Sequence, residues 1–194
     1  MALTELAFST HNIDTRQGMY ARFAQANRPG TAITLPRALT GTGAVIFFPD
    51  KGMKTCDLKM VLGDPKDFKD NIAGLALLAH ELTHAAQIYH AGSGAAFLRN
   101  YLAEMDHWAK QGLGFDDAYH CNRYEIEGHA VQYAILDVLN SEKSMQMFAG
   151  LCQICNPDPQ VADFDRAIFR LDFEAAYKRH LVNQQIACQQ KVKK

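Results

Sequence analysis

Residues 71–90 carry the strongest helical pattern in the chain. The stretch contains no proline, and its apolar residues recur at the i, i+3, i+4 spacing of an amphipathic α-helix. One stripe is formed by Leu75, Leu78, Ala79, Leu82, Ala86 and Tyr89. Leu77 and Ile88 lie outside this stripe, so the pattern predicts a helix that is apolar nearly all round and therefore buried. Asp70 is a candidate N-cap, and Gly92 can close the C-terminal end.

Shorter patterns surround this helix. Residues 43–49 are β-branched and aromatic between glycine and Pro-Asp, which predicts a strand, and residues 56–62 form a weaker one. A helix is expected at about 15–27. Further helices are expected at about 94–111, 123–140, 142–155 and from 158 onward. The first of these has a core stripe of Phe97, Tyr101, Met105 and Trp108. The sequence thus predicts an α+β fold, mostly helical, with a small N-terminal sheet.

Length and composition describe one ordinary globular domain over residues 1–194. Apolar residues make up 48% of the chain and the net charge is −1, which gives no electrostatic reason to expect nucleic acid as a partner. The longest apolar run carries two histidines and a glutamate, so no membrane span is expected. The N-terminus lacks the features of a secretory signal. We expect a cytoplasmic protein in the producing cell, and any export must use a route without a cleavable leader.

The cysteines are few and odd in number. The chain has five, Cys56, Cys121, Cys152, Cys155 and Cys188. This set fits free thiols in a reducing compartment better than a disulfide framework. Cys152 and Cys155 form a CxxC at the end of an expected helix, and we interpret them as packed thiols, with a redox or second metal site as the alternative.

The central helix contains the motif HELTH, formed by residues 80–84. Positions four apart lie on the same face of a helix, so His80 and His84 can bind one metal ion. Glu81 lies beside them and is the candidate general base for a metal-activated water. Two imidazoles and a carboxylate buried on an apolar helix need strong partners, and a metal ion supplies one. The motif therefore predicts a zinc site with His80 and His84 as ligands and Glu81 as the catalytic residue.

A third protein ligand is needed, and three residues are candidates. His90 completes a spacing of HExxHxxxxxH, but Gln87 stands where the chain would need glycine to turn away from the helix. Glu125, on the helix expected at 123–140, is the preferred ligand, and Glu127 is its alternative. Glu125 can also be read as part of a capping box with Asn122.

The motif segments resemble a family of bacterial gluzincin metallopeptidases. The resemblance covers about residues 35–134 and is carried by 37–40, 45–50, 77–87 and 122–129. Members carry a motif close to HELTHVVQQ and are often attached to toxins or extracellular contractile injection systems. The resemblance implies a zincin-like domain. The helices expected within 142–190 lie outside the resemblance, and we expect them to pack on that domain. In such proteins the third ligand belongs to an ExxxD element, and here Glu125 and His129 occupy its two ends.

An aspartate in that element orients a ligating imidazole, and His129 stands in its place. The carboxylate for this role could instead come from elsewhere in the chain. The candidates are Asp106, Asp116, Asp117 and Asp137.

The first functional hypothesis is a zinc-dependent endopeptidase acting on a protein or peptide, as a bacterial effector or toxin. Glu81 would deprotonate water and return the proton to the leaving amine. The residue that stabilises the oxyanion is left open among His120, His129, Tyr124 and Tyr133. The resemblance makes residues 45–48 the edge strand that pairs with substrate, and a plain core strand is the alternative. Two other functions are weighed: an inactive zinc-containing docking module of a secretion system, and hydrolysis of a non-peptide bond.

Overall fold

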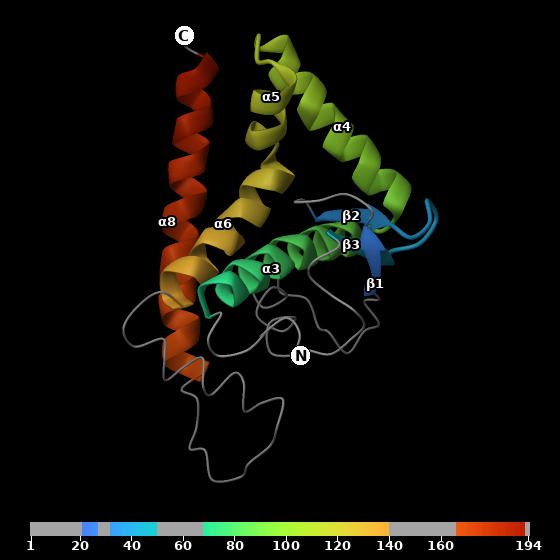
Figure 1. Ribbon diagram of the computed structural model, residues 1–194. Coiled ribbons are helices and arrows are strands. Elements are labelled where there is room, and N and C mark those ends of the chain that lie inside the picture. Colours follow the sequence, from blue (N-terminus) through green and yellow to red (C-terminus); the bar gives the residue numbers. More distant parts are fainter. Residues whose placement is uncertain (1–20, 27–31, 50–67, 140–165, 193–194) are drawn as a thin grey trace.

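Helices dominate the part of the chain that the computed structural model describes, residues 21–26, 32–49, 68–139 and 166–192 (Figure 1). The helices are α3 (Phe68–His90), α4 (Gly94–Lys110), α5 (Phe115–Cys121), α6 (Arg123–Leu139) and α8 (Arg166–Val192). The strands are β1 (Ala21–Ala26), β2 (Ile33–Pro36) and β3 (Ala44–Pro49). This confirms a mostly helical fold with a small N-terminal sheet. Among the described residues, no helix has both the length and the apolar character required to cross a membrane.

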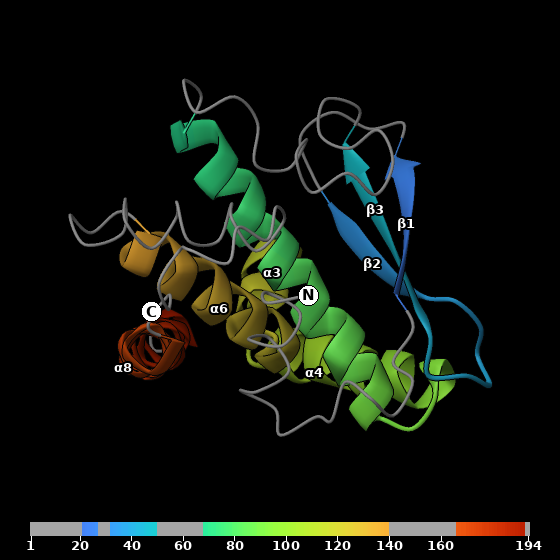
Figure 2. The ribbon, with the colours of Figure 1, turned by 90° about the horizontal axis from the view of Figure 1, so that it is seen from below.

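The elements form layers, with α3 in the middle (Figure 2). The sheet packs on one side of α3 and α6 packs on the other, while α8 covers the far side of α6. Residues 78–88 are consequently all buried, as the all-round apolar pattern predicts. Any polar side chain of this segment must therefore find its partner inside the protein.

The sheet has the strand order β1-β3-β2. β1 runs parallel to β3 and β2 runs antiparallel to it, with Thr34 opposite Ile46. Thr34, Ala44 and Ile46 are buried, whereas Ile33 and Leu35 are half exposed on the other face of β2. Because side chains alternate along a strand, Thr34 is the polar residue that β2 turns inward.

The connection between α3 and α4 is hydrogen-bonded to the loop between β2 and β3. Gly92 ends α3 with a φ of 77°, a conformation that favours glycine. Ser93 caps α4 by accepting a hydrogen bond from the Ala96 amide. The Gly94 amide donates to the Gly41 carbonyl in the β2–β3 loop, and a Cβ at position 94 would lie 2.4 Å from the Ala38 carbonyl oxygen. Glycine is therefore required where this helix meets the loop.

The structure differs from two sequence predictions and adds two elements. The segment expected to continue a helix to residue 27 is β1 at 21–26, because pairing with β3 overrides the helix propensity of its alanines. α3 begins at Phe68, two residues before the expected cap at Asp70. The short elements β2 and α5 were not predicted. Residues 15–20, the weak strand at 56–62 and the helix at 142–155 lie outside the described residues.

The thiol interpretation is wrong for two of the five cysteines. A disulfide joins Cys121, at the end of α5, to Cys188 on α8. Both are buried in a cluster with Ile126, against which Trp108, Leu113 and Leu181 pack. The two cysteines are 67 positions apart, so no local spacing in the sequence relates them. Cys56, Cys152 and Cys155 lie outside the described residues.

The disulfide should contribute strongly to stability because it closes a long loop. Cross-links of this kind stabilise proteins by about 2–4 kcal/mol, mainly by restricting the unfolded chain. We expect Cys188→Ser to lower the free energy of unfolding, measured by urea denaturation, by that amount. A reducing agent should do the same to the wild type and have little further effect on a Cys121→Ser/Cys188→Ser double variant. Equal stability of oxidised and reduced wild type would contradict this role.

Candidate metal centre

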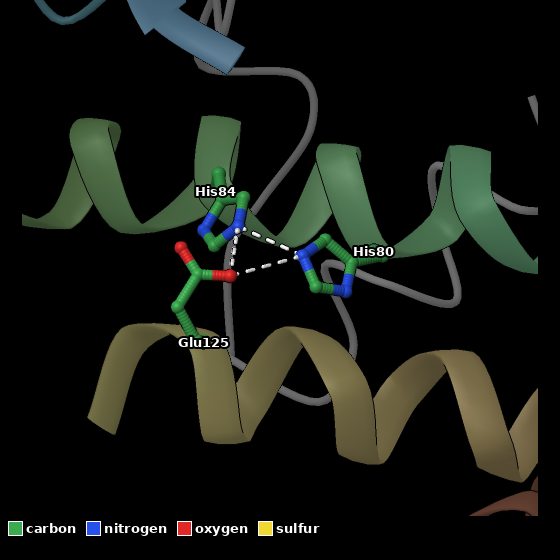
Figure 3. A group of neighbouring side chains, drawn as sticks. All are labelled: His80, His84 and Glu125. Atoms are coloured by element: carbon green, nitrogen blue, oxygen red, sulfur yellow. Dashed lines mark hydrogen bonds and ion pairs between the residues drawn. The ribbon is translucent and has the colours of Figure 1, made fainter. Parts of the chain in front are cut away.

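Two imidazoles from α3 point toward α6 at the centre of the layered structure (Figure 3). His80 and His84 are one helical turn apart, and both are buried. Their Nε2 atoms lie 3.0 Å from each other. Thr83, between them, is also buried and donates its hydroxyl proton to the Ala79 carbonyl one turn back. The helix therefore satisfies this polar residue through its own backbone, whereas the two imidazoles project from the helix toward α6.

The first turn of α6 supplies the third group. Asn122 is fully buried at the start of the helix, where its side-chain oxygen accepts a hydrogen bond from the Tyr124 amide. Its own amide group donates to the Tyr101 carbonyl on α4. This cap fixes where α6 begins, and Glu125 follows in the first turn with its carboxylate directed at the two histidines (Figure 3). Of the capping-box alternative, the structure therefore shows the bond made by Asn122.

The three groups converge on one point. Oε2 of Glu125 lies 3.4 Å from Nε2 of His80 and 3.5 Å from Nε2 of His84. Ligand atoms about 2.0–2.1 Å from a tetrahedral ion are separated from one another by about 3.3 Å, so the triangle has the size that such an ion requires. The buried His80, His84 and Glu125 group could hold a metal ion.

Charge in the cluster is arranged to favour a cation. Burial acts to lower the pKa of His84, but the adjacent Glu125 carboxylate outweighs it and raises that pKa to about 9. Burial also acts to raise the pKa of Glu125, yet the two imidazoles hold it well below its usual range. The pKa of His80 is lowered by burial and by His84. A carboxylate thus stays ionised in the interior, and a positive charge beside it offsets the burial.

The two oxygens of Glu125 have different surroundings. Oε1 accepts a hydrogen bond of 2.6 Å from the hydroxyl of Tyr101, whose pKa is raised by burial and by this carboxylate. Oε2 is buried and has no hydrogen-bond partner among the described residues. Buried carboxylate oxygens are rarely left without a partner. Tyr101 therefore orients the carboxylate, and Oε2 is the oxygen available to a metal.

The approach of α6 to His80 depends on Gly128. A Cβ at this position would lie 2.9 Å from both Cε1 and Nε2 of the His80 ring, closer than real contacts allow. Glycine here leaves the space that the imidazole occupies. One turn of α6 thus provides both the carboxylate, at Glu125, and the clearance for the ring that faces it.

His129 lies against the cluster without joining it. Its ring packs edge-on against His80, with the centroids 4.7 Å apart, and burial together with His80 lowers its pKa to about 4. His129 is therefore neutral at pH 7. Neither of its ring nitrogens, nor Nδ1 of His80, has a hydrogen-bond partner among the described residues. The hydrogen bond that would let His129 take the role of the aspartate in the ExxxD element is thus absent from this part of the chain.

The other oxyanion candidates differ in position. His120 and Tyr133 both pack on the ring of His129 rather than on a ligand. The Tyr124 ring stacks on Tyr101, and its hydroxyl accepts a hydrogen bond from Arg123 at the surface. His129 is the one of the four whose ring contacts that of a candidate ligand.

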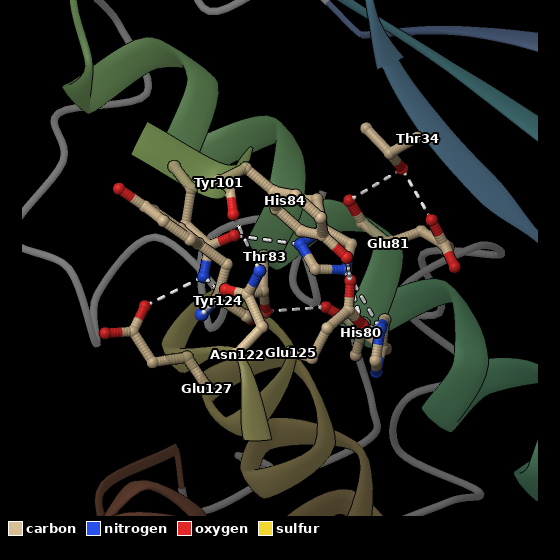
Figure 4. Close-up of polar contacts among 12 residues, drawn as sticks. Thr34, His80, Glu81, Thr83, His84, Tyr101, Asn122, Tyr124, Glu125 and Glu127 are labelled. Atoms are coloured by element: carbon tan, nitrogen blue, oxygen red, sulfur yellow. Dashed lines mark hydrogen bonds and ion pairs between the residues drawn. The ribbon is translucent and has the colours of Figure 1, made fainter. Parts of the chain in front are cut away.

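Glu81 extends to the sheet side of α3 (Figure 4). The hydroxyl of Thr34 on β2 lies 2.6 Å from Oε2 of Glu81 and 3.1 Å from its carbonyl oxygen. Burial raises the pKa of Glu81, while His84 and Thr34 act in the opposite direction. A carboxylate with a raised pKa next to a cation site has the properties of a general base.

The alternatives for the third ligand are now separated. α3 continues through Gln87 as expected, so His90 is the exposed last residue of the helix and is not part of the cluster. Glu127 accepts a hydrogen bond from Gln87 instead of facing the histidines. The carboxylate of Glu125 bonds to Tyr101, so the capping-box reading of Glu125 is wrong.

Three of the four aspartates considered above form exposed ion pairs. Asp106 pairs with Lys110, Asp117 with Lys191, and Asp137 with Arg179 and His180. Asp116 is exposed.

Sequence reasoning missed four residues of the centre: Thr34, Gln87, Tyr101 and Gly128. Only Gln87 had a local signal, because it stands three positions after His84 and so shares its helix face. Tyr101 was interpreted as a core position, since helical spacing does not show what its hydroxyl contacts. Thr34 is 47 positions from Glu81, a separation that no motif spans.

Comparison of the chain with protein-family models, with curated proteins and with solved structures finds no match. The geometry of the site therefore carries the functional argument.

The clearance at Gly128 can be tested by filling it. Gly128→Ala should displace the His80 ring and weaken zinc binding by at least ~10-fold, because a packed ring must move by several tenths of an ångström. Gly114→Ala is the matched control, since a Cβ there meets nothing within 4 Å. Zinc affinity measured by competition with a chelator checks the result. Unchanged affinity in a folded Gly128→Ala protein would contradict the predicted clash.

Proposed function

We propose that the protein is a zinc-dependent hydrolase of the zincin type that cleaves peptide bonds. The observation that carries the proposal is the buried convergence of His80, His84 and Glu125, with Glu81 next to it on the same helix. A cluster that only held the fold together would not need a further buried carboxylate beside it. The gluzincin resemblance of the HELTH and Glu125 segments supports the same assignment.

Zinc is the proposed ion because of the ligand set. Two imidazoles and one carboxylate suit zinc, whereas calcium and magnesium prefer oxygen ligands alone. Structural zinc sites are usually closed by four protein ligands, and catalytic sites take three and leave one position open. The cluster holds three candidate ligands among the described residues. When bound, zinc would supply Lewis acidity, which lowers the pKa of water and polarises a carbonyl.

Glu81 is the proposed general base. Its raised pKa brings the carboxylate closer to neutral pH, where it can take a proton from water and later give it to the leaving amine. Thr34 holds the carboxylate through one of its two oxygens, which makes Thr34 a positioning residue. α3 therefore supplies the proposed base, and β2 supplies the residue that positions it.

The peptide-binding strand needs reassignment. The resemblance made residues 45–48 the edge strand, but β3 is the middle strand, with β1 and β2 on its two sides. Among the strands that the structure describes, β2 lies at an edge of the sheet, and it packs against α3 and supplies Thr34. We therefore propose that extended substrate pairs with β2, where backbone hydrogen bonds provide affinity and side-chain pockets provide specificity.

The proposed biological role is that of a bacterial effector or toxin, and it rests on the family resemblance. Disulfides persist mainly in oxidising environments outside the cytoplasm. The Cys121–Cys188 bond therefore favours the exported alternative over a protein that stays in the producing cell.

The mechanism predicts that Glu81 and the metal ligands can be separated. Glu81→Gln keeps the size and the hydrogen bond to Thr34 but removes the base, so hydrolysis of a broad peptide library should fall by at least ~10²-fold. Zinc content should stay at the wild-type level, because Glu81 is not part of the ligand cluster. Turnover measured by mass spectrometry and zinc measured by elemental analysis check both outcomes.

The control is a Glu→Gln substitution at a surface position outside the metal centre. Glu174→Gln alters a glutamate on α8 that pairs with Arg170 at the surface, and it should leave turnover intact. Near-normal turnover in Glu81→Gln would contradict the assignment of Glu81 as the general base. A zinc-loaded wild type without any hydrolysis would favour the inactive docking module.

A further inference from the structure

Gln87, three residues after the second histidine of the motif, connects the metal centre to α6. Its side chain is 5% exposed, and its Oε1 lies 2.8 Å from Nδ1 of His84. Its Nε2 donates to the Tyr124 carbonyl at 3.1 Å and to Oε2 of Glu127 at 2.8 Å. Figure 4 shows His84, Tyr124 and Glu127 around this network. All the hydrogen-bonding groups of the amide are therefore used inside the protein.

The partners on α6 fix which way the amide points. A backbone carbonyl and a carboxylate can only accept hydrogen bonds, so the two of them must face the NH₂ group of Gln87. The amide oxygen is left for His84, and because that oxygen can only accept, Nδ1 of His84 must carry a proton. A neutral His84 then has its lone pair on Nε2, the nitrogen that faces His80 and Glu125.

We propose that Gln87 is a positioning residue, which, polarised by Glu127, holds His84 in the tautomer and orientation needed to bind the metal. The inference rests on the proposed zinc site and deepens it. It also explains why α6 contributes two glutamates to this region: Glu125 faces the metal position, and Glu127 acts through Gln87. Hydrogen-bond partners of this kind commonly change metal affinity by 10–100-fold.

The first test removes the amide. Gln87→Leu should weaken zinc binding by ~10–100-fold, measured by chelator competition. Gln189→Leu, at an exposed position of α8, is the matched control and should leave affinity unchanged. The stability of the metal-free proteins is measured alongside by urea denaturation. If Gln87→Leu lowers that stability but leaves zinc affinity at the wild-type level, Gln87 only joins two helices and the inference is overturned.

The second test exchanges the two polar groups and does not depend on Gln87→Leu folding. Gln87→Glu alone brings two carboxylates together, so zinc affinity should fall. Adding Glu127→Gln to it should recover part of the affinity, because an amide again donates to a carboxylate that can accept from His84, while the Tyr124 carbonyl stays without its donor. In the wild-type background Glu127→Gln should not strengthen binding. The same effect of Glu127→Gln in both backgrounds would show no coupling and would overturn the inference.

A spectroscopic measurement on the unaltered protein completes the design. In ¹⁵N-histidine-labelled, zinc-loaded wild type, His84 should show a protonated Nδ1 and a metal-bound Nε2. Zinc on Nδ1 would overturn the inference and leave the proposed function standing. A wild type without zinc affinity would overturn the proposed function, and this inference with it.

Discussion

The structure depends on a buried carboxylate held between two buried imidazoles. Glu125 stays ionised in the interior, although moving an unpaired carboxylate out of water is among the most unfavourable steps in folding. His80 and His84 offset that burial, and their own burial requires Glu125 in turn. Neither α3 nor α6 could bury its polar residues alone, so the packing of the two helices and the assembly of the site are the same event.

The surrounding elements each control one part of this cluster. Tyr101 on α4 donates a hydrogen bond to one oxygen of Glu125, and the cap at Asn122 sets where the first turn of α6 begins. Gly128 gives the His80 ring its space, and Gln87 connects His84 to the α6 backbone. The sheet acts on the opposite side, where Thr34 contacts Glu81. The groups that can bind a cation and the carboxylate proposed to move a proton are thus held by different partners.

Local patterns predicted much of this, because some of the constraints are local. The i, i+4 spacing of His80 and His84, the glycine after α3 and the cap at Asn122 all act within a helical turn or two. Helix geometry disfavoured His90, and Glu125 was preferred over Glu127 because it occupies the glutamate position of the ExxxD element. The buried cluster contains Glu125 and neither of the other two.

The remaining features depend on contacts between distant segments. β1 became a strand only because β3 lies beside it, and Cys121 meets Cys188 only because α8 packs near α5. The role of Tyr101 was hidden because an aromatic residue at core spacing shows nothing of its hydroxyl. Residues whose function is to hold another side chain are, in general, the ones that periodicity does not reveal.

X-ray absorption spectroscopy of the zinc-loaded protein tests the central claim most directly. The account predicts a first shell of nitrogen and oxygen at about 2.0–2.2 Å, with the outer-shell scattering of two imidazoles and no sulfur. A sulfur shell at about 2.3 Å would place zinc on cysteines such as Cys152 and Cys155, and a shell without imidazole would remove His80 and His84 as ligands. Either result would contradict the metal centre described here.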